Sequence, residues 1–161
     1  MFRNGKSILM PEAIFLIGIP TSGKSTFSNN PKYSKYVRVS SDDILQEIAK
    51  ERQQSYNAIF EGNIRFAQIA MMKVLRKAIE EDKSIIIDQT NLTKKSRREK
   101  IKLIPQHYKK TAVYFVIPLE TALKRNTQRP GKVIPPEVLE RMLKQYQLPT
   151  LEEGFDQVIR G

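Results

Sequence analysis

The stretch GIPTSGKST at residues 18–26 constrains the fold more than any other part of this chain. It matches the pattern G-x-x-x-x-G-K-[ST] in full, and it lies between an apolar run and a segment expected to be helical. In such a loop, glycines let backbone N–H groups converge on phosphate oxygens. The lysine supplies charge to the β- and γ-phosphates, and the next hydroxyl supplies a ligand to Mg²⁺. The stretch therefore predicts a loop that binds a nucleoside triphosphate; the alternative is a chance glycine-rich turn.

Apolar runs alternate with helical patterns along the rest of the chain. We expect short strands at residues 13–17, 36–40, 84–88, 111–117 and 155–159, and helices at 56–82, 93–104, 119–128 and 136–147. Continuous apolar runs of this length suit parallel strands that are covered on both faces. The alternation therefore predicts an α/β fold with a mostly parallel sheet.

Composition narrows the possible partners and compartments. The chain has 161 residues and a net charge of +11, which favours a polyanionic partner, nucleic acid first and a membrane surface second. A generic solvated basic surface is the alternative. Because the chain has no cysteine, it has no disulfide framework and no cysteine-based zinc site or nucleophile. This composition predicts a cytoplasmic protein, and the apolar run at 13–19 is too short to span a membrane.

Acidic residues follow two of the expected strands. Asp42 and Asp43 come after YVRVSS, and Asp88 comes after SIII. Because the carboxyl ends of parallel strands meet at one edge of the sheet, we expect these acids near the phosphate loop. Phosphoryl transfer uses one carboxylate to accept the proton of the attacking hydroxyl, and others near the metal. The alternatives are a favourable helix N-terminus for Asp42 and Asp43, and a structural role for Asp88.

Two arginines precede a break in the late helical pattern. Arg125 and Arg129 are four residues apart in ALKRNTQRPGK, so the pattern predicts both on one face of a helix that ends before Pro130. Arginines on a mobile segment balance charge in the transition state of phosphoryl transfer. A solvated basic face is the alternative.

Four stretches in order make a more specific pattern: GIPTSGKSTF, VSSDD, IIIDQTN and LKRNTQRPGKVIPPEVLERM. Together they resemble the kinase domain of the 5′-hydroxyl polynucleotide kinases of phage and bacterial nucleic-acid repair, over residues 14–159. Related P-loop kinases that act on other acceptors share parts of the pattern. The resemblance implies a P-loop kinase fold, with a five-stranded, mostly parallel sheet flanked by helices, a central phosphate-loop strand and a helical lid. We place an N-terminal extension at residues 1–12 and a single kinase domain at residues 13–161.

The resemblance also implies an activity and roles for individual residues. It implies ATP and Mg²⁺ as cofactors, and transfer of the γ-phosphate to the 5′-OH end of RNA or DNA. Lys24 matches the family's triphosphate lysine, Asp42 its general base, and Arg129 the lid arginine that contacts the phosphates. Ser25 matches the hydroxyl associated with Mg²⁺, and Asp88 is a further candidate near the metal. The predicted nucleotide-binding residues are Gly18, Thr21, Ser22, Gly23, Lys24, Ser25, Thr26, Arg125 and Arg129.

One position departs from that family. An arginine that contacts the acceptor's phosphate commonly follows the general base by three residues, but here Leu45 stands there, or Gln46 if the base were Asp43. The acceptor would then be held differently, with these candidates: Arg38, Arg52, Lys94, Lys95, Arg97 and Arg98. The alternative function is a P-loop kinase with a small-molecule or tRNA-linked hydroxyl acceptor. A nucleotide-binding module without transfer is a third. Oligomeric state and the choice between RNA and DNA are not predicted.

Overall fold

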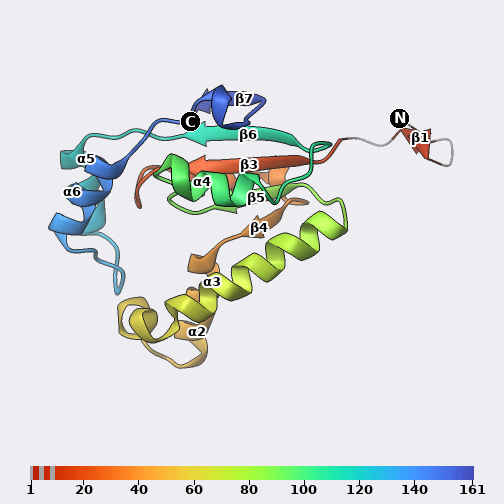
Figure 1. The fold of residues 1–161 in the computed structure, drawn as a ribbon. Helices are drawn as coiled ribbons and strands as arrows, with labels where there is room; N and C mark the ends of the chain where they lie inside the picture. The colour runs from red at the N-terminus through yellow and green to blue at the C-terminus, as the bar shows by residue number, and fades with distance from the viewer. Residues whose placement is uncertain (1, 4–5, 8–9) are drawn as a thin grey trace.

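The computed structural model describes residues 2–3, 6–7 and 10–161. A five-stranded sheet forms its centre, in the order β4-β5-β3-β6-β7, and every neighbouring pair is parallel (Figure 1). The strands are β3 (Glu12–Ile17), β4 (Val37–Val39), β5 (Ile85–Asp88), β6 (Lys109–Tyr114) and β7 (Gln157–Arg160). The predicted α/β fold with the phosphate-loop strand in the middle is therefore confirmed.

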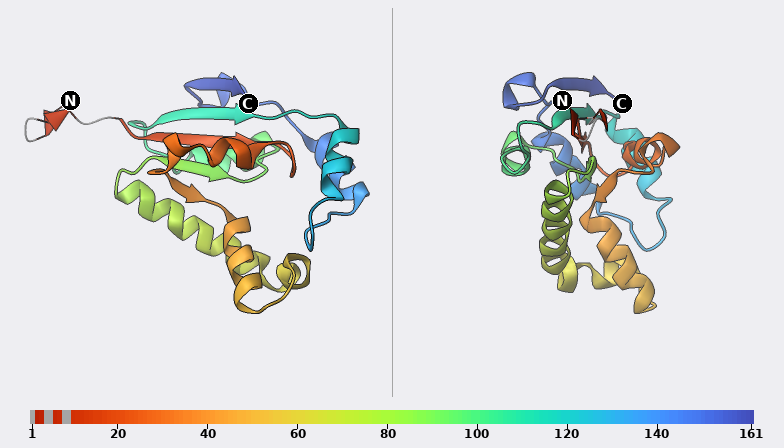
Figure 2. Two further views of the ribbon diagram at one scale, coloured as in Figure 1. Left: turned by 180° about the vertical axis from the view of Figure 1, so that it is seen from behind. Right: turned by 90° about the vertical axis from the view of Figure 1, so that its right-hand side faces the viewer.

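Helices cover both faces of this sheet and one of its ends. They are α1 (Lys24–Ser28), α2 (Ser41–Glu51), α3 (Tyr56–Glu80), α4 (Lys94–Ile101), α5 (Leu119–Asn126) and α6 (Pro136–Gln145). Seen along the sheet, α1 and α4 lie on opposite faces (Figure 2). The arrows of β3 and β6 point toward α5 and α6, which stand across the carboxyl ends of the strands. The edge of the sheet where ligands bind in α/β proteins thus faces these two helices.

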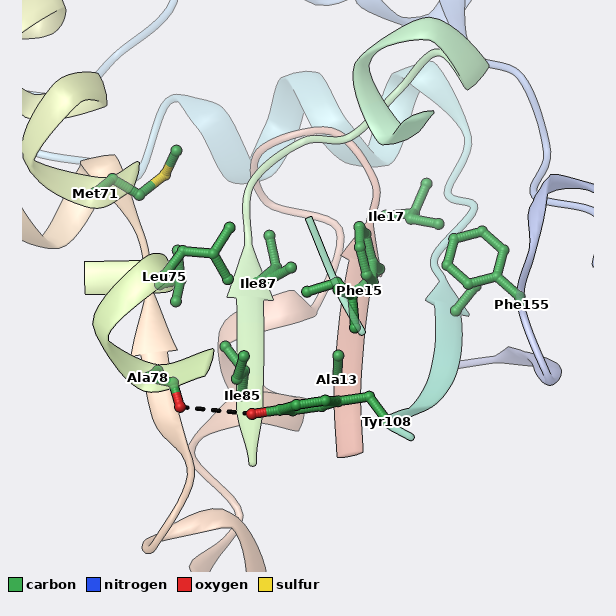
Figure 3. Packing of buried hydrophobic residues seen from close by; sticks show 13 residues of the cluster. Ala13, Phe15, Ile17, Met71, Leu75, Ala78, Ile85, Ile87, Tyr108 and Phe155 are labelled. Atoms are coloured by element: carbon green, nitrogen blue, oxygen red, sulfur yellow. Dashed lines mark hydrogen bonds between the residues drawn. The ribbon is translucent and has the colours of Figure 1, made fainter. Parts of the chain in front are cut away.

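Side chains of the central strand alternate between two apolar clusters. Ala13, Phe15 and Ile17 point to a cluster that α3 completes with residues such as Leu75 (Figure 3). Ile14 and Leu16 point to the other face, where Phe27 of α1 packs against them. Since both faces of β3 are buried, its sequence is apolar without a break, as is usual for parallel strands.

Several elements end earlier than the sequence patterns predict. The strand expected at 111–117 ends at Tyr114, and the helix expected at 93–104 ends at Ile101 in a series of tight turns. The long helix stops at Glu80, shortly before Asp82, whose φ of 51° is incompatible with a continuing helix. Apolar residues continue past the observed ends of β6 and α4, which is why the patterns there predict longer elements.

The segment that we assigned to an N-terminal extension is only partly described. Phe2–Arg3 (β1) and Lys6–Ser7 (β2) form a two-stranded antiparallel pair that is separate from the five-stranded sheet. Residues 1, 4–5 and 8–9 lie outside the described residues. Glu12 is the first residue of β3, and the division of the chain at residue 12 stays a prediction. None of the helices in the described part of the chain combines the length and the hydropathy that a membrane crossing requires.

Candidate active site

The phosphate loop connects β3 to α1 and needs glycine at two positions. A Cβ on Gly18 would lie 2.5 Å from the Ser22 hydroxyl, which is closer than atoms approach without a shift. Gly23 has a φ of 108°, a conformation that side chains with a Cβ rarely adopt. The backbone N–H of Gly18 donates to the carbonyl oxygen of Thr90 at 3.0 Å, which ties the loop to the segment after β5.

The side chain of Lys24 contacts the backbone of the loop that precedes this residue in the sequence. Its ammonium donates to the carbonyl oxygens of Gly18 at 2.7 Å and Ile19 at 3.0 Å. Burial lowers the pKa of Lys24 to about 8; Asp88 acts in the opposite direction, and the positive charge of Arg129 adds to the lowering. An anion bound beside this ammonium would favour its charged form, as the triphosphate of a nucleotide does.

A cavity of about 1540 Å³ opens over the phosphate loop. It is larger than most small-molecule sites, so it has room for a nucleotide and part of a second substrate. Its lining includes almost all the predicted site residues: Thr21, Ser22, Gly23, Lys24, Ser25, Thr26, Asp42, Asp88, Arg125 and Arg129. Gly18 contributes through its backbone below the cavity. Of the candidates for holding the acceptor, Arg38 lines the cavity, whereas Arg52, Lys94, Lys95, Arg97 and Arg98 are not among its lining residues.

The first turn of α2 carries the candidate general base. Ser40 caps this helix, because its hydroxyl accepts a hydrogen bond from the backbone N–H of Asp43. The Asp42 carboxylate accepts hydrogen bonds from Lys132 Nζ at 3.0 and 3.2 Å and from Gln46 Nε2 at 2.6 Å. Burial alone would raise the pKa of Asp42, but hydrogen bonds from Lys132 and Tyr56 outweigh it and lower the pKa. Asp42 is therefore ionised at neutral pH and faces the cavity.

Asp43 and Asp88 share a different cation. Arg38 Nε lies 2.9 Å from Asp43 Oδ2, and Arg38 Nη2 donates to Asp88 Oδ2 at 2.8 Å. Burial raises the pKa of both carboxyl groups, and Arg38 offsets part of that increase. Asp43 is not among the cavity-lining residues, so the geometry supports Asp42 rather than Asp43 as the acid that meets an acceptor.

The loop between α5 and α6, residues 127–135, forms a lid loop over the cavity. Arg125 Nη1 donates to the carbonyl oxygen of Thr21, which connects α5 to the phosphate loop. Because α5 ends at Asn126, the prediction that Arg125 and Arg129 share one helix face is wrong. The Asn126 side chain bonds both the N–H and the carbonyl of Ile134, which joins the last residue of α5 to the far end of the lid loop. Arg129 instead lies in the lid loop, and its buried Nη1 has no hydrogen-bond partner among the residues that the structure describes.

The sequence patterns did not predict a hydrogen-bond network that supports the strand before the phosphate loop. Asn91, at a φ of 48°, donates from its side chain to the carbonyl oxygen of Leu16 in β3 at 2.8 Å. The Asn91 carbonyl accepts from Arg97 Nη1, and its side-chain oxygen accepts from Lys100 Nζ. Arg97 is fully buried and paired with Glu153 at 2.7 Å. Arg97 therefore serves the structure, and the suggestion that it holds an acceptor phosphate is wrong.

Residues that could hold Mg²⁺ also line the cavity. The Ser25 hydroxyl and the Asp88 carboxylate are both at its surface, and hard oxygen donors of this kind suit Mg²⁺. Within the described residues, no three carboxylate, histidine or cysteine side chains form a cluster that could hold a metal ion. This donor set fits a cation that is bound mainly through substrate phosphates, as Mg²⁺ is in P-loop enzymes.

Comparison with known proteins agrees with this geometry. The family model described as an AAA domain matches residues 14–149. The chain belongs to this family. The fold is that of the P-loop kinases. Because this family uses ATP, membership supports a phosphotransferase activity with a nucleotide as the phosphate donor.

Similar proteins act on more than one kind of acceptor. An L-seryl-tRNA(Sec) kinase of Methanococcus maripaludis is 29% identical over 89% of this chain and 55% of its own length. A bifunctional polynucleotide phosphatase/kinase of Schizosaccharomyces pombe is 28% identical over 91% of this chain and 32% of its own length. In the Pnkp1/Rnl/Hen1 RNA repair complex, one chain matches with a TM-score of 0.65 and 24% identity, over 89% of this chain and 46% of that one. This chain therefore spans about half or less of the length of each of these three proteins.

Proposed function

We propose that this P-loop kinase transfers the γ-phosphate of ATP to the 5′-OH end of RNA or DNA. The observation that carries the proposal is the position of Asp42, an ionised carboxylate in the same cavity as Lys24 and the phosphate loop. Similarity to a polynucleotide phosphatase/kinase and the net charge of +11 support a nucleic-acid acceptor. A cytoplasmic location and a role in phage or bacterial repair stay predictions.

The proposed mechanism assigns one task to each group in the cavity. Asp42 accepts the proton of the 5′-hydroxyl while the hydroxyl oxygen attacks the γ-phosphorus. The bond between that phosphorus and the bridging oxygen breaks, and ADP leaves with the electron pair. Lys24 and Arg129 stabilise negative charge on the transferred group, and Arg125 holds the lid side of the cavity to the phosphate loop.

Ser25 and Asp88 would hold Mg²⁺ in this scheme. When bound, Mg²⁺ neutralises charge on the β- and γ-phosphates. The Asp88 carboxylate already pairs with Arg38, so we assign it an accessory position near the metal and Ser25 the direct contact.

The alternative is a kinase whose acceptor is a small molecule or a hydroxyl linked to tRNA. Two observations favour it. A seryl-tRNA kinase is among the similar proteins. In addition, Leu45 is fully buried between α2 and α3, so the position that carries a phosphate-binding arginine in polynucleotide kinases cannot contact an acceptor.

Transfer of labelled γ-phosphate from ATP tests the proposal directly. The acceptors are 5′-OH RNA and DNA oligonucleotides of one sequence, with 5′-phosphorylated copies and seryl-tRNA as comparisons. Label on the 5′-OH strands alone is the expected result, and the Lys24→Ala variant should abolish it. Label on seryl-tRNA alone would favour the alternative, and ATP binding without transfer to any acceptor would favour a nucleotide-binding module.

A further inference from the structure

The cavity continues beyond the phosphate loop toward the N-terminal half of α3. Its lining there includes Asp42 from α2, Tyr56 and Phe60 from α3, and Lys132 from the lid loop. The Tyr56 and Phe60 rings lie 5.8 Å apart between centroids, and Phe60 keeps 37% of its surface exposed. The segments that carry these residues are far apart in sequence, since Asp42 and Lys132 are separated by 90 residues. This end of the cavity is where an acceptor hydroxyl would meet Asp42.

Lys132 is the cation best placed to contact an acceptor. Lys24 and Arg125 bond to the backbone of the phosphate loop. Arg38 is held between two carboxylates and also donates to a serine hydroxyl. Arg129 lies close enough to both Lys24 and Tyr56 for its charge to favour a lower pKa in each, so it lies between the two ends of the cavity, and the proposed mechanism already assigns it to the transferred group. Among the described residues that line the cavity, Lys132 is the remaining basic side chain, and its partner is the candidate base itself.

Neighbouring contacts fix Lys132 in this position. Its ammonium lies 4.5 Å from the centroid of the Tyr56 ring, and 21% of its side chain is exposed. On either side of it, the carbonyl of Gly131 accepts from the N–H of Asn57, and the carbonyl of Val133 accepts from the Asn57 side chain. The lid loop is therefore docked on the start of α3 with Lys132 aimed at Asp42.

The rings beside Lys132 indicate what the rest of an acceptor must offer. Tyr56, Phe60, Ile64 and Val133 give this end of the cavity an apolar wall, and the polar side chains of Gln46, Asn57 and Glu61 line the cavity beside it. A flat nucleobase can stack on exposed aromatic rings such as that of Phe60. The wall and the cation together fit a group with one flat apolar face and one negative charge beside the reacting hydroxyl.

We propose that Lys132, Tyr56 and Phe60 form an acceptor subsite that selects a nucleotide with a free 5′-hydroxyl and a phosphate on its 3′ side. This inference rests on the function proposed above. On binding, Lys132 exchanges the Asp42 carboxylate for the acceptor phosphate, and this exchange leaves Asp42 free to accept the hydroxyl proton. Lys132 thereby takes the place of the arginine that Leu45 replaces, from a different element of the fold.

Paired changes in enzyme and acceptor test this subsite. A nucleoside 3′-monophosphate is compared with the same nucleoside, and a 5′-OH oligonucleotide with one whose first residue lacks a base. We expect Lys132→Gln to lower kcat/KM by about 10- to 100-fold on the 3′-monophosphate and about threefold or less on the nucleoside. We expect Phe60→Ala to cost about tenfold only where the first base is present. Lys124→Gln and Phe66→Ala are matched controls, because both side chains are exposed and neither lines the cavity.

The outcomes separate this inference from the proposed function. If the wild-type protein phosphorylates none of these acceptors, the proposed function fails and the subsite fails with it. If it does phosphorylate them, equal losses with and without the acceptor phosphate would overturn the role of Lys132 alone. Lys132 would then act only on Asp42. KM for ATP and the thermal unfolding temperature, measured on every variant, identify any general loss of structure.

Discussion

The buried ion pair between Arg97 and Glu153 gives a sharp prediction about the support of the phosphate loop. Arg97 is 0% exposed, and its guanidinium makes two hydrogen bonds to the Glu153 carboxylate, at 2.7 and 3.1 Å. Glu153→Ala would leave a buried positive charge without its partner, which typically costs about 3–5 kcal/mol. For a domain of this size, about 2–4 °C of Tm is lost per kcal/mol, so the Tm should fall by about 6–20 °C.

The same change should reach the active site through Asn91. Arg97 Nη1 donates to the Asn91 carbonyl at 2.8 Å, and the Asn91 side chain bonds to Leu16 at the end of β3. An arginine that has lost its carboxylate is less firmly placed, so we expect KM for ATP to rise in Glu153→Ala. Thermal unfolding and steady-state kinetics on one preparation measure both effects. Glu152→Ala is the matched control, because the neighbouring carboxylate is exposed and should change stability by less than about 0.5 kcal/mol.

The pH dependence of this effect has a definite sign. Burial raises the pKa of Glu153, but hydrogen bonds from Arg97 and from the Thr150 backbone lower it below its ordinary value of 4.5. A depressed native pKa contributes stability above pH 4.5, and this contribution is lost as the pH falls through the native pKa. The gap in Tm between wild type and Glu153→Ala should therefore narrow in acid. A loss below about 1 kcal/mol at neutral pH would refute the reasoning, as would an Arg97→Met/Glu153→Leu double variant less stable than Glu153→Ala.

Three further predictions concern the cavity itself. Burial lowers the pKa of Lys24 to about 8, and its ammonium must be charged to hold phosphate, so the affinity for ATP should fall above pH 8. In Lys24→Arg this fall should be absent when ATP binding is measured from about pH 6.5 to 9.5. Asp42→Asn should lower kcat by about 10²–10⁴ and Asp43→Asn by much less, and the reverse order in single-turnover assays would assign the base to Asp43. Gly131→Ala places a Cβ at a φ of 69° and 3.2 Å from Ser55 Cβ, so it should weaken docking of the lid loop on α3 by about 1 kcal/mol or more. The KM for the acceptor should then rise about fivefold, and Gly131→Asn should raise it less.

The nucleotide half of the site was predictable because it depends on local sequence. Gly18, Gly23 and Lys24 belong to one contiguous motif, and their roles follow from backbone geometry that the motif itself imposes. The centre of the sheet was equally predictable, since β3, β5 and β6 contain apolar runs that both layers of helices bury. Predictions from the sequence were wrong where a tertiary contact places a residue differently from what its local sequence pattern indicates. Arg97 sits in a run of charges that is typical of a solvated helix face, yet a carboxylate 56 residues away holds it in the interior.

The acceptor half could not be predicted in the same way, because no single segment encodes it. Hydrogen bonds from Lys132 and Tyr56 lower the pKa of Asp42, and these two residues belong to the lid loop and to the start of α3. Their positions depend on Asn57 and Gly131, whose contact joins two elements that no motif connects. Since docking of the lid loop brings Lys132 to Asp42, the pKa of the candidate base depends on the position of the lid loop. Displacement of Lys132 by an acceptor phosphate would release the base only when a substrate is in place.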